Sequence, residues 1–252
     1  MAEKNRYSAL CIVIPVYNEG GNIRQTIREI EGKIRTPHDI LVVYDFEEDD
    51  TLPAVREVIQ EGMSHMRLVR NKYGRGVLNA IKTGFESAGE GAVLVVMADL
   101  SDDLAVVDTM FKRMNEGSDI VCGSRYMKGG RQVGGPLFKK MLSRAAGVSL
   151  HYLAGLPTRD VTNSFKMYSK EVLDNIRIES GGGFELGMEI VVKAHFMGYK
   201  ISEVPSTWQD RVAGESRFML RKWLPKYLHW YFFAIRSSIL PGAAKKFRGT
   251  AQ

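Results

Sequence analysis

The chain has 252 residues, 44% of them hydrophobic and 25% charged, and its net charge is +6. A chain of this size and apolar content can bury a substantial core, so one large domain is favoured over two small ones. No stretch reaches the roughly 18 apolar residues that cross a bilayer, and residues 1–7 contain no apolar signal region, which argues against integral membrane and secreted classes.

Strand-like and helix-like patterns alternate along the first half of the chain. Strands are expected where apolar residues run continuously, and helices where they recur at helical spacing, as at Ile23, Ile27 and Ile30. In chain order we expect strand 10–14, helix 22–33, strand 40–44, helix 52–60, strand 66–69, helix 77–88, strand 92–98, helix 104–114 and strand 120–122. These five repeats predict an α/β fold, with a mainly parallel sheet flanked by helices.

The two cysteines indicate the compartment. Cys11 and Cys122 both lie inside apolar strand-like runs, where a thiol behaves as a small hydrophobic side chain. We expect two buried free thiols and therefore a reducing, cytoplasmic environment.

Acidic residues follow three of the expected strands. Glu19 follows the first, Asp45 and Asp49 follow the second, and Asp99 follows the fourth. Ligands of open α/β sheets bind beyond the carboxyl ends of the strands, so these acids predict a shared nucleotide cleft, in which Asp99 holds a divalent cation against a diphosphate. The alternative is a set of surface or helix-capping acids. The glycine-rich segment 129–135 is interpreted as a mobile loop over this site.

Other motifs are weak. Gly74 and Gly76 follow the third expected strand and lack the third glycine of a dinucleotide fingerprint, which disfavours nicotinamide-dependent oxidation. The five histidines are not spaced along the sequence as metal ligands usually are; they are His38, His65, His151, His195 and His229.

Several segments resemble family 2 glycosyltransferases. Residues 12–19 (IVIPVYNE) resemble the family's opening strand and turn, residues 45–51 its acidic turn, and residues 71–80 its Asn-x-Gly-x-Gly segment. Five further segments resemble the dolichol-phosphate mannose synthase branch of this family: 123–126, 160–165, 183–185, 203–205 and 210–217. The resemblance implies a GT-A (Rossmann-like) fold, a nucleotide-sugar donor and a polyprenyl-phosphate acceptor. The donor-binding residues that it implies are Pro15, Tyr17, Glu19, Asp45, Asp49, Gly74 and Gly76.

The chain departs from the family pattern at the metal motif. The first Asp of Asp-x-Asp is Met97, and the Gln that often follows is Ser101. Methionine is a poor ligand for Mg²⁺ or Mn²⁺, so Asp99 is the side chain retained from the family's metal site, and weak metal binding is expected. Phe46 and Glu47 also make the second turn bulkier and more acidic than the family's Asp-Gly-Ser.

A phosphate acceptor is already anionic, so the site needs cations more than a strong general base. The resemblance assigns Arg125, Lys139 and Ser143 to the acceptor phosphate, with Lys139 where the family usually has Arg. It assigns Arg211 and Arg217 to the donor diphosphate. The alternatives are a structural ion pair for Arg125 and a solvated helix start at residues 139–140.

The C-terminal segment is strongly basic. Residues 211–252 hold nine Lys or Arg and one acid, a net charge of +8 that leaves −2 for residues 1–210. Aromatic residues alternate with the cations between positions 218 and 236, which is typical of amphipathic helices lying in the lipid headgroup layer. We therefore divide the chain into a glycosyltransferase domain, 1–216, and a membrane-interface segment, 217–252. Pro225 is expected to kink this segment or to split it into two short helices. The alternative is a helix packed on the protein's own core; a nucleic-acid partner is not expected.

Together these features predict a metal-assisted, inverting hexosyltransferase. It would move a mannose- or glucose-type sugar from a nucleotide to a polyprenyl or dolichyl phosphate, with Mg²⁺ or Mn²⁺, as a peripheral protein on the inner face of a membrane. Transfer to a saccharide or lipid hydroxyl stays open and would need a carboxylate base. A catalytically reduced, membrane-bound subunit that binds nucleotide also stays open, because of Met97.

Overall fold

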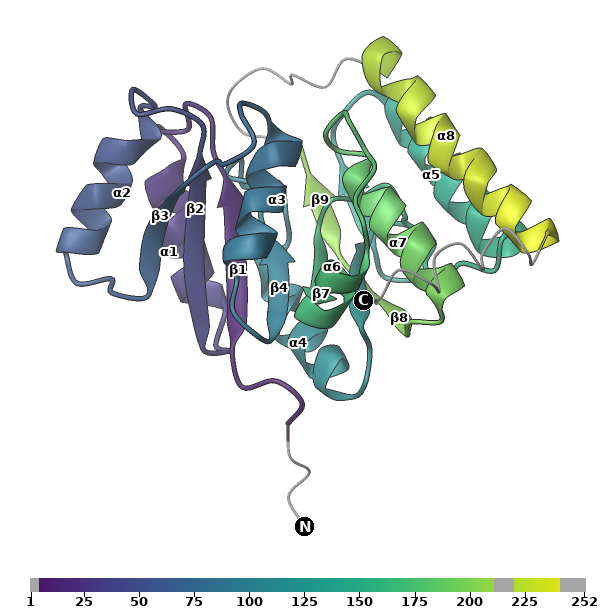
Figure 1. Cartoon of the computed structure of the whole chain (residues 1–252), viewed down its shortest axis with the longest axis horizontal. Helices are drawn as coiled ribbons and strands as arrows, with labels where there is room; N and C mark the ends of the chain where they lie inside the picture. The colour runs from purple at the N-terminus through teal and green to yellow at the C-terminus, as the bar shows by residue number, and fades with distance from the viewer. Residues whose placement is uncertain (1–4, 211–219, 241–252) are drawn as a thin grey trace.

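The computed structural model describes residues 5–210 and 220–240, and within these ranges the core is a seven-stranded sheet (Figure 1). The strand order is β3-β2-β1-β4-β7-β5-β8. The strands are β1 Leu10–Pro15, β2 His38–Tyr44, β3 Met66–Arg70, β4 Ala92–Val95, β5 Ile120–Ser124, β7 Lys166–Ser169 and β8 Ile201–Pro205. Only β7 runs antiparallel to its neighbours within this sheet, so the expected mainly parallel sheet is confirmed.

Helices cover both faces of the sheet. The helices are α1 Ile23–Lys33, α2 Thr51–Gln60, α3 Val77–Ser87, α4 Val107–Asn115 after a 3₁₀ turn η1 Leu104–Val106, α5 Leu137–Leu153, α6 Lys170–Asn175, α7 Leu186–Met197 and α8 Leu220–Ile239. In Figure 1, α3, α6 and α7 lie in front of the sheet and α1 and α4 behind it. Strands buried on both faces explain the continuous apolar runs in the sequence.

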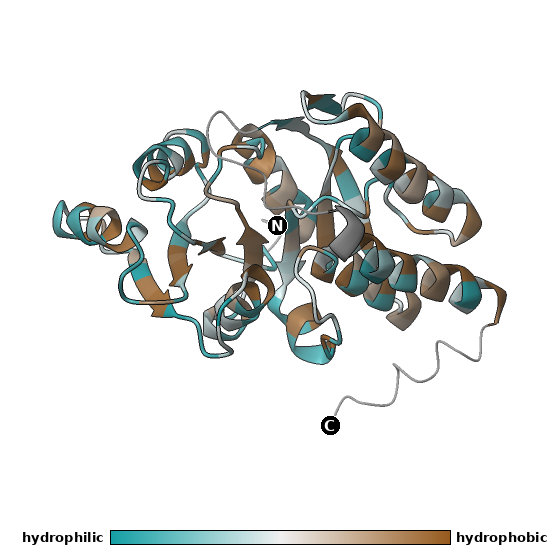
Figure 2. Ribbon diagram, turned by 90° about the horizontal axis from the view of Figure 1, so that it is seen from above, coloured by the Kyte–Doolittle hydropathy of each residue, from teal (hydrophilic) through white to brown (hydrophobic). Residues whose placement is uncertain are grey.

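Two apolar cores result from the alternation of side chains along each strand. Ile12 packs with Ile27 of α1 on one face, and Val13 packs with Phe85 of α3 on the other. Figure 2 shows apolar residues along the central strands, whereas the surrounding helices alternate apolar and polar residues. Both cysteines are free; Cys122 is buried as expected, and Cys11 is half-buried.

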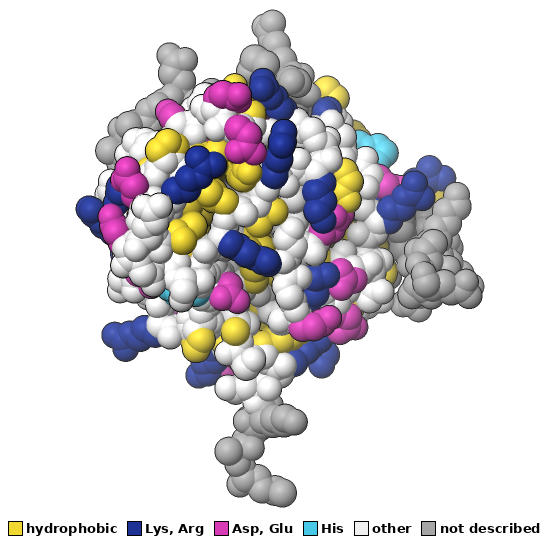
Figure 3. Space-filling view, turned by 60° about the vertical axis from the view of Figure 1, so that its left-hand side comes forward, with side chains coloured by type: hydrophobic (Ala, Val, Ile, Leu, Met, Phe, Trp, Pro, Cys, Tyr) yellow, Lys and Arg dark blue, Asp and Glu magenta, His cyan; other side chains and the backbone are white. Residues whose placement is uncertain are grey.

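Charges of both signs are interspersed at the β3 end of the molecule. Figure 3 shows Lys and Arg side chains next to Asp and Glu side chains over this face, with small apolar areas between them. The face in view therefore lacks a large field of one sign among its described residues.

The prediction of a loop over residues 129–135 is wrong in part, because Arg131–Val133 form strand β6. This strand pairs in parallel with β9 (Thr207–Gln209) in a separate two-stranded sheet. The pairing also reaches the acidic turn after β4: the Gln209 N–H donates to the Ser101 carbonyl at 3.0 Å. Backbone hydrogen bonds to a neighbouring segment therefore order a stretch whose glycines suggest a loop.

Of the two expected effects of Pro225, a split is not found, because α8 is one helix that contains Pro225. Proline costs a hydrogen bond to the preceding turn, but here it lies near the start of the helix, and tertiary packing holds the helix on both sides of it. Trp223, Trp230 and Ala234 are buried, and α8 contacts α5 and α7. The alternative of a helix packed on the protein's own core is thus correct for this face of α8.

In the part of the chain that the structure describes, no helix combines the length and apolarity needed to cross a bilayer.

Candidate active site

The acidic residues that follow the strands converge at one edge of the sheet. Strands β2, β1 and β4 are adjacent and parallel, so their carboxyl ends lie together at the upper edge in Figure 1. The expected convergence of these strand ends is therefore confirmed. The contacts of each acid differ, however, and they separate residues that shape the site from residues that can reach a ligand.

Asp49 supports the turn after β1. It is 1% exposed, and its carboxylate accepts hydrogen bonds from the Asn18 N–H, at 3.1 Å to each oxygen, and from the Thr51 N–H at 2.9 Å. Glu19 donates its own N–H to the Thr51 hydroxyl at 2.9 Å. Pro15, at the end of β1, is buried. Through these hydrogen bonds Asp49 ties the segment after β2 to the turn after β1.

Asp45 fixes the glycine segment. Its two oxygens accept from the Asn71 side-chain amide at 2.7 Å and from the Gly76 N–H at 2.8 Å. Gly74 and Gly76 have φ values of 83° and 130°, which strongly favour glycine. The glycines therefore allow a turn that brings the segment after β3 against the end of β2.

An aromatic and cationic cluster lies beside these acids. The rings of Tyr17 and Phe46 meet edge to face with centroids 5.5 Å apart, and the Arg75 guanidinium lies 4.7 Å from the centre of the Phe46 ring. Tyr17 is 38% exposed. Sequence reasoning noticed Phe46 as a departure but missed Arg75, which no spacing connects to residue 46.

Asp99 lies next to a second carboxyl group that sequence reasoning missed. Asp99 accepts a hydrogen bond from the Ser101 N–H at 3.2 Å, and Asp102 accepts from the Met97 N–H at 3.4 Å. Burial and the negative charge of Asp99 raise the pKa of Asp102 to about 7. Two neighbouring carboxylates suit a hard cation such as Mg²⁺ or Mn²⁺, so these side chains fit the implied ion although Met97 supplies no oxygen.

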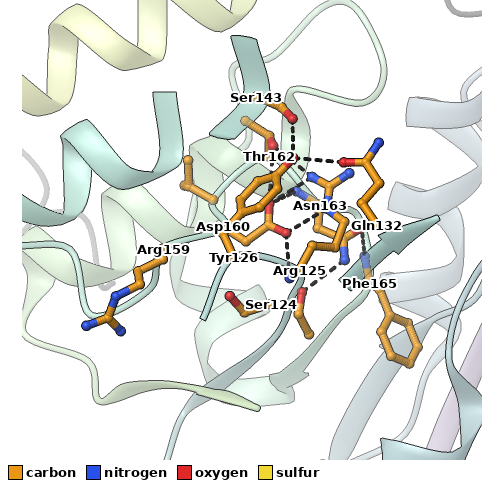
Figure 4. A network of polar contacts seen from close by, with 12 residues as sticks. Ser124, Arg125, Tyr126, Gln132, Ser143, Arg159, Asp160, Thr162, Asn163 and Phe165 are labelled. Atoms are coloured by element: carbon orange, nitrogen blue, oxygen red, sulfur yellow. Dashed lines mark hydrogen bonds and ion pairs between the residues drawn. The ribbon is translucent and has the colours of Figure 1, made fainter. Parts of the chain in front are cut away.

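Arg125 forms a buried ion pair (Figure 4). Its Nε and one terminal nitrogen donate to the Asp160 carboxylate at 2.7 and 2.8 Å, and the same nitrogen donates to the Thr162 hydroxyl at 3.1 Å. Burial raises the pKa of Asp160, but the charge and hydrogen bonds of Arg125 outweigh burial and lower it overall. The structural ion pair that the sequence left open is therefore present.

Arg125 also lines a cationic pocket of about 380 Å³. The other basic residues in its lining are Arg131, Lys140 and Arg144. Lys140 and Arg144 lie one turn apart on α5, and Lys140 Nζ donates to the Gln132 carbonyl at 3.1 Å. No acid is among the described residues that line the pocket, so it suits an anion.

Two of the residues that the sequence assigns to the acceptor phosphate, Lys139 and Ser143, lie on α5. Lys140, rather than Lys139, lines the pocket. Ser143 is hydrogen-bonded to the Tyr126 hydroxyl, and Tyr126 lines the pocket. Lys139 and Ser143 are four residues apart on α5, and so are Lys140 and Arg144, so each pair shares a face of the helix. The sequence spacing cannot tell which of these two faces lines the pocket. Arg211 and Arg217 lie outside the described residues.

Solved structures with the same fold are glycosyltransferases. Glucosyl-3-phosphoglycerate synthase from Mycobacterium tuberculosis, in complex with Mn²⁺, UDP and glucosyl-3-phosphoglycerate, matches with a TM-score of 0.62 at 16% identity, over 93% of this chain and 79% of that one. The same enzyme with Mg²⁺ and UDP matches with a TM-score of 0.61 at 16% identity, again over 93% of this chain and 79% of the other. The expected GT-A fold is confirmed.

Two curated relatives of this chain are named for mannose transfer to dolichol phosphate or polyprenol phosphate. The dolichol-phosphate mannosyltransferase of Pyrococcus furiosus is 30% identical over 82% of this chain and 58% of its own length, so the chain spans little more than half of that relative. The polyprenol monophosphomannose synthase of Mycolicibacterium smegmatis is 25% identical over 87% of this chain and 85% of its own. The glycosyl transferase family 2 model matches residues 11–177. The chain therefore belongs to glycosyl transferase family 2.

Proposed function

We propose that this protein transfers a hexose from a nucleotide sugar to a polyprenyl phosphate at the surface of a membrane. One observation carries the proposal: the cationic pocket borders a helix that exposes large apolar side chains. Lys140 and Arg144 of α5 line the pocket, while Leu137, Phe138 and Met141 of the same helix are 75%, 67% and 69% exposed. A polyprenyl phosphate has the matching chemistry, since it joins an anionic head to a long apolar tail.

The apolar surface continues onto α8, which packs beside α5. Its outward-facing Leu228, Phe232 and Ile239 are 40%, 62% and 70% exposed. Apolar patches on this scale mark interaction sites, and helices with one polar and one apolar face bind in the headgroup layer. We infer a peripheral position, with α5 and α8 toward the bilayer on the cytoplasmic side.

The donor nucleotide is assigned to the cleft at the ends of β1, β2 and β4. Tyr17, Phe46 and Arg75 offer aromatic and cationic groups for contact with a base. Asp99, with Asp102 beside it, would hold a Mg²⁺ or Mn²⁺ ion, which offsets the negative charge of the leaving diphosphate when bound. The nucleotide and metal ions bound by the Mycobacterium tuberculosis synthase support this assignment.

The reaction needs little acid–base chemistry. An oxygen of the acceptor phosphate forms a bond to the anomeric carbon of the sugar, and the bond from that carbon to the diphosphate breaks with inversion. The nucleophile is already ionised, so the protein's main tasks are to hold two anions close and to offset their repulsion. Arg131, Lys140 and Arg144 are assigned to the acceptor phosphate, while Asp160 holds Arg125 beside them.

The decisive experiment offers two acceptors to the enzyme with labelled nucleotide sugar. We expect label in polyprenyl phosphate and none in the matching polyprenol. Lys140→Ala and Arg144→Ala should each reduce acceptor-dependent turnover by about ten- to a hundredfold, since a charge-assisted contact contributes roughly 1.5–3 kcal/mol. Lys128→Ala is the matched control, because Lys128 is exposed and outside the pocket lining. Equal labelling of the alcohol, or full activity in both pocket variants, would refute the proposal.

One observation favours transfer to a hydroxyl as the second candidate. A pKa of about 7 suits Asp102 to remove a proton from an alcohol near neutral pH. In that case the polyprenol or a saccharide accepts the label, and Asp102→Asn abolishes transfer. Complete absence of transfer, with nucleotide binding retained, would indicate the nucleotide-binding subunit instead.

A further inference from the structure

The edge of the sheet opposite the active site brings together two histidines and a glutamate. Glu31 lies in the last turn of α1, His38 is the first residue of β2, and His65 directly precedes β3. One ligand atom from each residue can be chosen so that all three lie within 4.8 Å of one another. The seven-residue strand β2 separates His38 from the active-site end by about 20 Å, so this group is distinct from the donor site.

The fold fixes this arrangement through the backbone. Because β2 and β3 are parallel neighbours, their starting residues lie side by side, and the Ile40 N–H donates to the His65 carbonyl at 2.9 Å. His38 has the same strand parity as Ile40, which packs on the α1 side of the sheet. Its imidazole therefore turns toward the end of α1, where Glu31 lies.

Both ring nitrogens of His38 face hydrogen-bond acceptors, which a neutral imidazole cannot satisfy without a cation. Its Nδ1 lies 2.8 Å from the Thr36 carbonyl oxygen, which can only accept, so Nδ1 carries the hydrogen. In the neutral ring Nε2 is then a lone pair, and it faces Glu31 Oε1 at 3.2 Å, which is another acceptor. A proton or a metal ion must lie between them. A backbone carbonyl on the far nitrogen is also the usual support of a metal-binding histidine.

Distances and chemistry favour a metal of the zinc type. His65 Nε2 lies 2.9 Å from the same Glu31 oxygen, and two ligands of a tetrahedral zinc ion are about 3.3 Å apart, given bonds of roughly 2.0–2.2 Å. The side chains of Glu31 and His65 are 34% and 36% exposed, which leaves a fourth position for water.

We propose that Glu31, His38 and His65 form a binding site for Zn²⁺ or a similar divalent transition metal, which links α1 to the starts of β2 and β3. Nitrogen and carboxylate ligands in this number are a common zinc set. The bound ion would stabilise the first half of the sheet and take no part in sugar transfer, since it lies at the opposite edge from Asp99.

The test uses the full chain without nucleotide, in an Asp99→Asn background that removes one of the two carboxylates expected at the other cation site. We expect one Co²⁺ per chain with the intense visible absorption of tetrahedral cobalt, and Zn²⁺ should displace it. Zinc at a hundredfold excess over its dissociation constant should raise the Tm by roughly 5–10 °C.

Variants make the assignment specific. His65→Gln and Glu31→Gln should each weaken Zn²⁺ binding at least about tenfold, since even loss of an outer partner costs that much, and should abolish the cobalt spectrum. His229→Gln is the matched control, because His229 is exposed on α8 and should leave binding unchanged. If the Asp99→Asn protein gives no tetrahedral spectrum, or if adding His65→Gln or Glu31→Gln to it leaves zinc binding unchanged, the three residues are only a hydrogen-bonded group.

Discussion

Asp160 and Asp102 are two acids near Arg125 whose environments push their pKa values in opposite directions. Asp160 is fully buried, but Arg125 contacts both of its oxygens and lowers its pKa. Asp102 faces the charge of Asp99 instead, and burial together with that charge raises its pKa to about 7. Neighbouring charges therefore decide which of these acids stays ionised.

The shifted pKa of Asp102 makes stability depend on pH. Between its usual value of 3.8 and about 7, the folded state binds more protons than the unfolded chain, so this residue's contribution to the free energy of unfolding falls as the pH rises through that window. Asp102→Asn should therefore raise the Tm at about pH 8, by roughly 2–4 °C for each kcal/mol regained, and change it little at about pH 4. Calorimetry in chelator checks this, with Glu90→Gln as the exposed control; parallel pH curves for wild type and Asp102→Asn would contradict it.

The role of Asp99 is tested by removing its charge. Asp99→Asn should weaken binding of a nucleoside diphosphate with Mn²⁺ by at least about tenfold and leave the Tm of the free protein near that of wild type. The reciprocal variant Met97→Asp should tighten Mn²⁺ binding, because it adds the missing oxygen ligand. Calorimetric titration measures both. Unchanged affinity in Asp99→Asn would place the cation elsewhere.

At the scale of elements, α5 and α8 each divide into a packed face and an apolar outer face. Leu150 of α5 is fully buried, and the Trp230 indole of α8 donates to the Ser180 hydroxyl at 3.1 Å while Lys193 lies 4.9 Å from its ring. The outer faces carry Phe138 and Phe232. The two helices are seen at the right of Figure 2, with apolar and polar residues mixed along both.

Membrane binding should depend on the outer faces and stability on the inner ones. The double change Phe138→Ser and Phe232→Ser should reduce co-sedimentation with anionic liposomes by more than about tenfold, since burying each ring contributes roughly 1.5–3 kcal/mol, with little change in Tm. Tyr73→Ser, at an exposed position on the glycine segment, should bind liposomes like wild type. If the double variant still pellets with vesicles as wild type does, these helices are not the membrane contact.

At the scale of the whole molecule, one parallel sheet has chemistry at both ends. Asp99 follows β4, whose carboxyl end lies beside that of β1, while His38 and His65 lie at the amino ends of β2 and β3. Sites this far apart with no shared ligands are expected to contribute independently to stability.

Thermal shifts should therefore separate the two ends. Asp99→Asn should lose the rise in Tm that UDP or GDP with Mn²⁺ produces and keep the rise produced by zinc, while His65→Gln should show the reverse. Differential scanning of both variants with each ligand measures this. Loss of both shifts in either variant would mean that the two ends are coupled.

Local patterns in the amino-acid sequence are enough to predict the α/β class, the convergence of acids at one edge and the family. Strand and helix follow from local apolar periodicity, and parallel topology brings the strand ends together, so the sequence places Glu19, Asp45 and Asp99 at one edge of the sheet. The ordered motifs between residues 12 and 217 identified the family because each preserves residue types at fixed local spacing.

Only the tertiary structure decided which side chains meet. Arg125 pairs with Asp160, Lys140 rather than Lys139 lines the pocket, and His38 reaches His65 because β2 and β3 are neighbours. Packing also overrode local signals where α8 passes through Pro225 and where residues 131–133 pair with β9. The physical reason is the same in each case: these contacts join residues distant in sequence or distinguish adjacent faces of a helix, and periodicity carries no information about either.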